Sequence, residues 1–246
     1  MRRQIAAIAS ASLVVLAAAA ARADGYEPVV TAAPVSLPAA DWTGFYANAG
    51  VGYGFWDAQT TTDAPGRCVS CATTDHAGRG WLGEVGFGYD YQVSHRIVAG
   101  LLVNYAVADI RGNVSDSVFT TARTSSETTW FVGLRAGWLM TPEILNYLSV
   151  GYTQAHFSGG SLRNSYTGAP LPGARLAGYD AGGWFLGTGL EVAMHGGWHW
   201  RGEVRYADYG KKARTETGIS PVFNLNFDPV VGTATTGLVY RFDWGR

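Results

Sequence analysis

Two residues near the middle of the chain have the types and the spacing of a hydrolytic pair. His156 and Ser158 are two positions apart in "AHFSGG", so a strand would place both side chains on one face. An imidazole acts as the base for a serine hydroxyl when a carboxylate orients the ring. Glu191 falls on the opposite face of the neighbouring predicted strand, and Asp180 belongs to a predicted loop. A lone histidine and serine at a strand end are more often interface residues, so we expect no catalytic site.

A second group of residues has the types needed for ion pairs. Three carboxylates and two guanidinium groups fall on one face of the predicted strands: Glu84, Arg135, Glu191, Glu203 and Arg205. These groups should pair, because a buried charge without a partner costs on the order of several kcal/mol. Planar guanidinium groups suit carboxylates, and Asn48 and Arg241 are further candidate partners. Two interpretations stay open: a salt-bridged plug, or a gate in which Arg135 or Arg205 changes partners.

The two cysteines, Cys68 and Cys71, stand in the polar segment "CVSC". In an exported chain, a local disulfide between them is the simplest interpretation. A thioredoxin-like redox centre would need a βαβ context, which the sequence pattern does not offer. A zinc site would need more ligands than His76 adds, and the other histidines scatter over both ends of the predicted strands. We therefore predict no metal and no cofactor.

These residues lie in or next to segments in which apolar residues alternate with small or polar ones. A period of two is the pattern expected of β-strands. In "WTGFYANAGVGYGFW", aromatic and aliphatic residues occupy most odd positions, and glycines occupy most even ones. Charged residues well inside the segments fall on the second face only. The eight segments are Trp42–Trp56, Arg79–Tyr91, Ile97–Asp109, Thr128–Met140, Tyr147–Phe157, Gly183–Met194, Trp198–Tyr209 and Val230–Phe242.

This pattern admits two architectures. A lipocalin-like barrel would turn its apolar face inward, whereas a membrane barrel turns that face to lipid and has a polar interior. Segments of ten or more residues match the length of tilted transmembrane strands. The connections also alternate in length, as short periplasmic turns and long outer loops do. The short ones are 92–96, 141–146 and 195–197, and the long ones are 58–78, 111–127, 158–182 and 210–229.

Aromatic residues complete the argument for a membrane barrel. The apolar face ends in large rings, which favour the two membrane interfaces. These residues are Trp81, Tyr91, Trp130, Trp138, Trp184, Trp198 and Tyr206. The sequence therefore predicts an all-β fold: an eight-stranded antiparallel transmembrane β-barrel with short periplasmic turns and long extracellular loops.

The start of the chain and its composition indicate export. A basic "MRRQ", an apolar run over 5–20 and the small residues around Ala23 predict a signal peptide at 1–23, with an uncleaved anchor as the alternative. A Pro/Ala-rich periplasmic linker is expected at 24–41, the barrel at 42–242 and a short tail at 243–246. The net charge of -1 argues against a nucleic-acid partner.

Three segments carry a resemblance to a known family. After its Pro/Ala-rich linker, "WTGFYANAGVGYGFW" resembles the first strand of the small eight-stranded outer-membrane β-barrels, a group of OmpA-like and opacity-type proteins and alphaproteobacterial surface antigens. The segment "GGWFLGTGLEVAMHGGWHWRGEVRYADYG" resembles the sixth strand, turn and seventh strand of that family. "GLVYRF", at Gly237–Phe242, resembles its closing strand. The likeness extends from Trp42 to Phe242.

The resemblance implies a location in the outer membrane of a Gram-negative cell, in contact with lipid and lipopolysaccharide. It also implies insertion by the outer-membrane assembly machinery, which would recognise Gly237, Tyr240 and Phe242 of the closing strand. Such barrels usually end on an aromatic residue, whereas residues 243–246 follow Phe242 here. Deleting these four residues and measuring outer-membrane yield tests whether the tail belongs to the signal.

For function, the resemblance implies a structural surface protein that supports the envelope, is not an enzyme and meets an unknown extracellular ligand through its loops. A narrow small-solute channel is the alternative. A lipid A-modifying enzyme is the third class, because His156 and Ser158 resemble the pair in lipid A deacylase barrels. Basic loop residues are expected to meet lipopolysaccharide phosphates: Arg67, Arg79, Arg163, Arg175, Lys211, Lys212 and Arg214.

Overall fold

The computed structural model describes residues 41–64, 67–115, 119–218 and 224–242, without the side chains of residues 63–73. Within these ranges no helix has the length and apolar composition needed to cross a membrane. The described residues form eleven strands of one antiparallel sheet. The strands are β1 (Gly44–Ala64), β2 (Arg67–Gln92), β3 (Ile97–Ser115), β4 (Thr120–Thr141), β5 (Ile144–Phe157), β6 (Gly160–Asn164), β7 (Pro170–Leu176), β8 (Tyr179–Ala193), β9 (Trp198–Asp208), β10 (Lys212–Thr217) and β11 (Asn224–Arg241).

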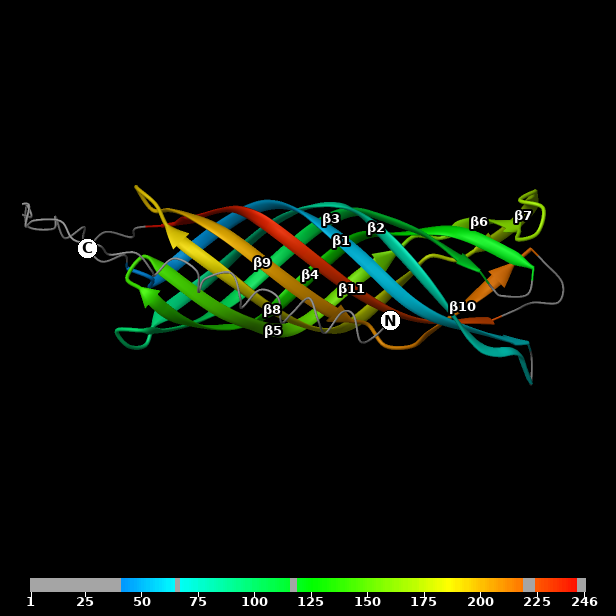
Figure 1. Cartoon of the computed structure of the whole chain (residues 1–246), viewed down its shortest axis with the longest axis horizontal. Coiled ribbons are helices and arrows are strands. Elements are labelled where there is room, and N and C mark those ends of the chain that lie inside the picture. The colour runs from blue at the N-terminus through cyan, green and yellow to red at the C-terminus, as the bar shows by residue number, and fades with distance from the viewer. Residues whose placement is uncertain (1–40, 65–66, 116–118, 219–223, 243–246) are drawn as a thin grey trace, which may run out of the picture. The chain divides into compact units, whose positions relative to one another are not determined.

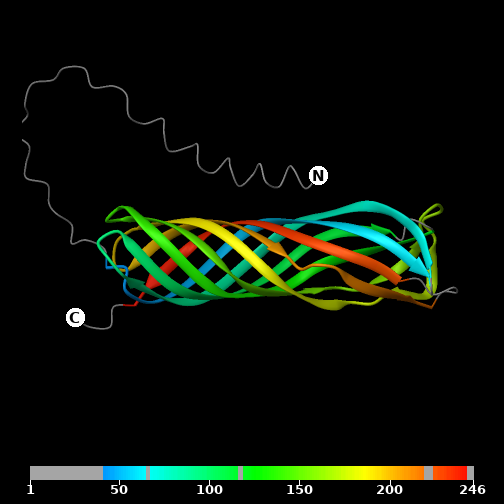
Figure 2. The same ribbon diagram turned by 90° about the horizontal axis from the view of Figure 1, so that it is seen from below.

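Eight of these strands close into a barrel. They neighbour one another in the order β1-β2-β3-β4-β5-β8-β9-β11, and β11 pairs back with β1. The closing pair is long, because its register runs from Tyr46 opposite Arg241 to Asp63 opposite Asn224. Figures 1 and 2 show these strands coiling around one common axis. The predicted eight-stranded antiparallel barrel is confirmed.

The segments predicted as long loops are mostly strand, so that part of the prediction is wrong. β1 and β2 occupy most of 58–78, and β3 and β4 occupy much of 111–127. β6, β7 and β10 fill parts of the other two segments and pair in the order β4-β6-β7-β10-β11. A second ring, with β6, β7 and β10 in place of β5, β8 and β9, therefore continues the barrel (Figure 1, right end).

The residue composition of these outer segments explains why the sequence pattern did not predict their strands. "TTTDA" in β1 and "TTARTSSETT" in β4 are rich in threonine, a β-branched residue that suits strands. In a membrane barrel, apolar and polar residues alternate where one face of the strand meets lipid. Beyond the bilayer this constraint ends, while the backbone hydrogen bonds between strands continue.

The outward face of the barrel is apolar between two rows of aromatic rings. Six of the seven predicted interface aromatics are exposed, and the ring of Tyr206 lies 5.6 Å from the ring of Trp184. Trp130 and Trp138 are eight residues apart on β4. At ~3.3 Å per residue and a tilt of ~40°, that spacing spans about 20 Å, and ten residues span about 25 Å. This height agrees with the apolar band of about 25 Å in outer-membrane barrels.

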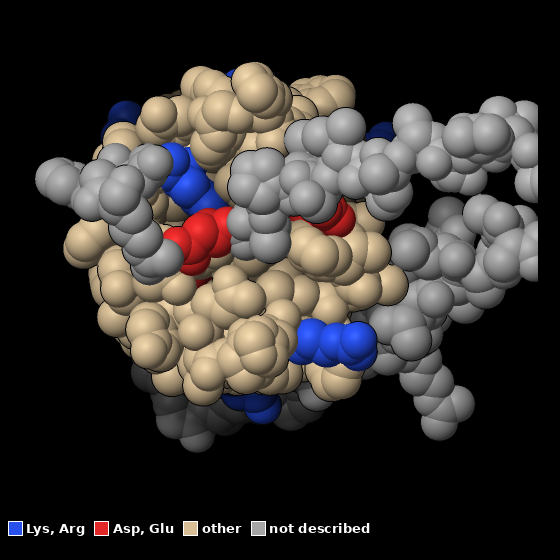
Figure 3. Space-filling model, turned by 90° about the vertical axis from the view of Figure 1, so that its left-hand side faces the viewer, with Lys and Arg blue, Asp and Glu red and all other residues tan. Residues whose placement is uncertain are grey.

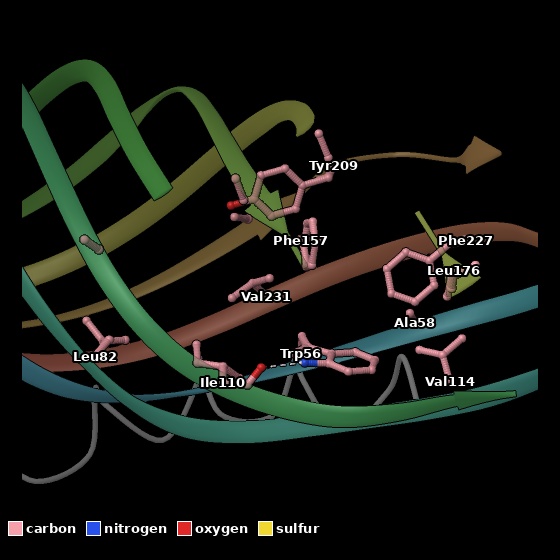
Figure 4. Close-up of a cluster of buried hydrophobic side chains, with 14 of the residues drawn as sticks. Trp56, Ala58, Leu82, Ile110, Val114, Phe157, Leu176, Tyr209, Phe227 and Val231 are labelled. Carbon is pink, nitrogen blue, oxygen red and sulfur yellow. Dashed lines mark hydrogen bonds between the residues drawn. The ribbon is translucent and has the colours of Figure 1, made fainter. Parts of the chain in front are cut away.

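The interior has two chemically different parts. Charged side chains lie toward the short turns, and Figure 3 shows blue and red groups at the centre of that end. Toward the outer hairpins the interior is largely apolar and includes Trp56, Ile110, Phe157 and Phe227 (Figure 4). There the indole Nε1 of Trp56 donates a hydrogen bond to the carbonyl of Ile110 at 3.1 Å. The expectation of a polar interior therefore holds only in part for the outer half of the barrel, where apolar side chains pack beside the buried Thr124, Arg214 and Glu216.

Candidate functional site in the barrel interior

Glu191, on β8, lies at the centre of the first of two ion-pair clusters and is 0% exposed. Its Oε1 accepts hydrogen bonds from Nη1 of Arg135 at 2.6 Å and from Nε of Arg201 at 2.9 Å. Its Oε2 accepts from Nη2 of Arg241 at 2.9 Å. Asp90, on β2, pairs with Arg135 through both carboxylate oxygens and with Arg241 at 2.7 Å. These five residues form the turn-side cluster.

Arg205, on β9, holds the second cluster together. Its Nη1 donates to Oε2 of Glu84 at 2.7 Å, and its Nη2 donates to Oε1 of Glu203 at 2.8 Å. The remaining oxygens of both carboxylates also have donors. Asn104 donates to Oε1 of Glu84 at 2.8 Å, and the hydroxyl of Tyr147 donates to Oε2 of Glu203 at 2.9 Å. We call these five residues the mid-barrel cluster.

Aromatic rings pack against the guanidinium groups of both clusters. The guanidinium carbon of Arg135 lies 4.5 Å from the centroid of the Tyr46 ring and 4.9 Å from that of Tyr147. The corresponding carbon of Arg205 lies 4.2 Å from the centroid of Phe131. Such cation–π contacts contribute about 2 kcal/mol when the cation is desolvated. Rings therefore occupy the interior beside the ion pairs.

The two clusters balance each other in charge. Three arginines face two carboxylates in the turn-side cluster, and one arginine faces two carboxylates in the mid-barrel cluster, so the formal charges of +1 and -1 cancel. The structure places all five residues of the predicted network within these clusters. Sequence reasoning left out Asp90 and Arg201. The signal that could have found them was the alternation of side chains between the two faces of a strand. This alternation already assigned both residues to the interior face.

Little room remains among these side chains. A cavity lined by Asn48, Glu84 and Arg201 has a volume of ≈ 10 Å³. That volume is at the lower limit for a single water molecule, about 10–15 Å³. An eight-stranded barrel is just wide enough for its side chains to fill it. The arrangement can thus hold the strands together and obstruct a path along the barrel axis.

The predicted hydrolytic pair lies outside the barrel, above the outer aromatic row. Nδ1 of His156 is 2.8 Å from Oδ1 of Asp180, so the loop carboxylate does reach the imidazole. The hydroxyl of Ser158 instead lies 2.9 Å from the Ser125 hydroxyl and accepts a hydrogen bond from the Ser125 backbone at 2.9 Å. Among the described contacts, none joins His156 to Ser158. The three residues do not form a triad in this arrangement.

The remaining predicted residues lie elsewhere in the chain. Cys68 and Cys71 belong to the part of β2 whose side chains are not described, so the disulfide lies outside the described residues. In β11, Gly237 is opposite Gly50, and the ring of Tyr240 lies 5.0 Å from that of Trp198. The Phe242 backbone N–H donates to the carbonyl of Phe45 at 3.0 Å. Their role in assembly stays a prediction.

Among the described residues, no group of histidine, cysteine and carboxylate side chains could hold a metal ion.

The closed antiparallel ring, its apolar outer band between aromatic rows and its charged interior define an outer-membrane β-barrel protein. The sequence agrees with this class. A family model described as "outer membrane protein beta-barrel domain" matches residues 7–242. The chain belongs to this family, and it is located in the outer membrane.

Relatives and solved structures support the same assignment. The 31 kDa outer-membrane immunogenic protein of Brucella melitensis is 25% identical over 221 residues, which cover 86% of this chain and 88% of the relative. The protein of the same name from Brucella suis matches equally well. The crystal structure of the outer membrane protein OprG from Pseudomonas aeruginosa superposes with a TM-score of 0.55 at 12% identity, over 81% of this chain and 96% of OprG. This last likeness concerns the fold alone.

Proposed function

We propose that the protein is a closed structural barrel that supports the outer membrane and presents its extended hairpins outside the cell. The filled interior carries this proposal. Two balanced ion-pair clusters occupy the barrel near the turns, and packed apolar side chains occupy it near the hairpins. The Brucella relatives are named immunogenic outer-membrane proteins, which fits hairpins that are exposed at a cell surface.

A conductance measurement tests the closed barrel. The chain from residue 24, refolded in a planar lipid bilayer, is expected to give no reproducible current steps. Folding is checked separately by the heat-dependent shift of the band in gel electrophoresis. Reproducible single-channel steps from the folded protein would contradict the closed barrel and favour the narrow channel.

The channel alternative makes its own prediction about Arg135. In that case Arg135 would leave Asp90 or Glu191 and open a water path, and replacing it by Ala would raise the conductance. In a closed barrel the same substitution lowers stability without producing current. Arg163→Ala, in the exposed part of β6, serves as the matched control for both measurements.

We also propose that the protein has no lipid-modifying activity. Ser158 is held by Ser125 rather than by His156, although Asp180 meets the imidazole. The mass spectrum of lipid A is therefore expected to be the same in cells that express the protein, in cells that lack it and in cells with Ser158→Ala. A change in lipid A acylation that depends on Ser158 would establish an enzyme.

The outer hairpins are the proposed surface for recognition. They stand beyond the aromatic row, where the lipopolysaccharide sugars and phosphates surround a barrel of this kind. Exposed basic residues such as Arg79 and Lys211 lie in this zone. We propose that they meet those phosphates, and that any further extracellular ligand binds to the same hairpins.

A further inference from the structure

Within the described residues, strand pairing in the barrel wall is interrupted between the β8–β9 pair and the β7–β10 pair. β8 and β9 pair as far as Trp184 opposite Asp208, and β7 and β10 pair from Leu176 opposite Glu216. The two pairs share the same register, because Leu176 is eight residues from Trp184 on one side and Glu216 is eight residues from Asp208 on the other. The intervening residues, 177–183 on one side and 209–215 on the other, have no paired partner across the gap. We call this interruption the seam.

Each side of the seam is otherwise attached to the wall. Residues 179–183 pair with β5, and residues 212–215 pair with β11. The seam thus separates two intact parts of the sheet over about 26 Å of strand length. Glycines at 178, 182, 183 and 210 border it, and Gly210 has a φ of 63° that suits a bend.

The depth of the seam points to the outer leaflet. It begins at Trp184, in the outer aromatic row, and continues away from the apolar band. It therefore faces the layer of lipid head groups. Its rim carries the exposed side chains of Asp180, Lys211 and Lys212.

Aromatic side chains pack directly behind the seam. The ring centroid of Phe157 lies 5.3 Å from that of Tyr179, 5.7 Å from that of Tyr209 and 6.0 Å from that of Phe227. Figure 4 shows Phe157 next to Tyr209 in this part of the interior. These rings give an apolar surface just inside an interruption of the wall.

Arg214 introduces a charge into this apolar surface. The residue is 2% exposed, and its guanidinium carbon lies 4.9 Å from the Tyr179 ring and 5.7 Å from the Phe227 ring. Its Nη2 donates across the seam to the carbonyl of Ala177 at 2.6 Å and to that of Ser158 at 3.1 Å. Both acceptors are neutral. Burial lowers the pKa of Arg214 to about 10, as expected of a desolvated cation.

Two polar atoms at this place have no hydrogen-bond partner among the described residues. They are Nη1 of Arg214 and the hydroxyl of Tyr179, and both are buried. No carboxylate of the described residues forms an ion pair with Arg214. Glu216, the next inward residue on β10, accepts a hydrogen bond from Thr120 on β4 instead. A buried cation with a free donor, beside a phenol with a free hydroxyl, is suited to bind an anion.

We propose that Arg214 and Tyr179 bind the head group of an acidic amphiphile, whose apolar chain lies on the Phe157, Tyr209 and Phe227 rings after entry through the seam. The ligand class is a single carboxylate on an apolar chain. The carboxylate would accept hydrogen bonds from Nη1 of Arg214 and from the Tyr179 hydroxyl. Binding requires the glycine-bordered edges to separate, because packed side chains close the seam in this structure. This site goes beyond the structural role and is independent of conduction along the barrel axis.

Photolabelling tests the proposal on the full chain in phosphatidylcholine vesicles. The probe is dodecanoate with a diazirine on its chain, and labelled peptides are mapped by mass spectrometry. Labelling of peptides that contain Phe157, Tyr179 or Tyr209 is expected to exceed labelling by the matched dodecanol probe by about tenfold or more, because a charged hydrogen bond supports the acid alone. Peptides on the lipid-facing wall, such as the one with Leu134, serve as the internal standard because both probes reach them from the bilayer.

Variants separate head-group binding from general partitioning. Arg214→Gln, which keeps a donor for the Ala177 carbonyl, should lose most of the excess labelling, whereas Arg163→Gln on exposed β6 should keep it. Tyr179→Phe should lose part of the excess. Equal labelling by acid and alcohol in the unaltered chain, or labelling confined to the lipid-facing wall, would overturn the proposal without any variant. An excess that persists in folded Arg214→Gln would overturn it as well.

Discussion

Replacing Glu191 by Gln is expected to lower the free energy of unfolding by roughly 3–5 kcal/mol. The substitution keeps the shape of the side chain but removes its charge. Asp90 would then be the one carboxylate left in the turn-side cluster, where it pairs with Arg135 and Arg241, and Arg201 would lose its ion-pair partner. Breaking a buried ion pair is costly because the remaining charges are no longer compensated. Urea unfolding in phospholipid vesicles, followed by tryptophan fluorescence, measures the change.

The same Glu-to-Gln replacement at an exposed position serves as the control. It distinguishes the loss of a buried charge from the effect of the replacement itself. Glu127, on β4, is exposed and contacts the hydroxyl of Ser125. Glu127→Gln should alter the free energy of unfolding by no more than about 0.5 kcal/mol, as is usual for exposed positions. If the two variants were equally stable, the turn-side cluster would not hold the barrel together.

Placing an arginine on the lipid-facing wall should give the second large effect. Val85 lies on β2, four residues from Trp81 and six from Tyr91, and its side chain is 54% exposed. A position between the two aromatic rows is near the middle of the apolar band. Val85→Arg is therefore expected to destabilise the barrel by about 2–4 kcal/mol in vesicles, since a charge at the bilayer midplane is poorly solvated.

The same substitution at the end of the same hairpin provides the comparison. Val93, in the turn after β2, is 59% exposed, about as much as Val85. Val93→Arg should cost about 0–1 kcal/mol, because this position lies at the interface. Urea unfolding in vesicles measures both variants. A larger cost at Val93 than at Val85 would show that the bilayer does not lie between the aromatic rows.

The sequence determined the membrane-spanning part of the fold. Lipid outside and a confined interior impose opposite chemistry on alternate residues, so each spanning strand carries its own signature. Trp81, Val85 and Phe87 face outward as their parity predicts, and Glu84 faces inward. The same parity assigned Asp90 and Arg201 to the interior. The alternation does not give distances between side chains on different strands, however. The ion pairs of these two residues therefore could not be predicted from it.

Tertiary structure alone decided what lies beyond the bilayer. The threonine-rich hairpins form strands because neighbouring strands extend the barrel sheet, a cause that lies outside their own residue pattern. Likewise, Trp56 and Phe227 continue the inward faces of β1 and β11, but only the pairing of β1 with β11 brings their ring centroids to 5.8 Å from each other.

The seam is the clearest case of a feature that the sequence could not give. Arg214 is a basic residue in a segment that the sequence predicts to be an exposed outer loop. It was therefore predicted to meet lipopolysaccharide. In the structure it is buried and crosses to the Ala177 carbonyl, 37 residues away along the chain. A residue pattern records which face a side chain takes on its own strand. Which strands stop pairing, and what then fills the gap, depends on the registers of the whole closed sheet.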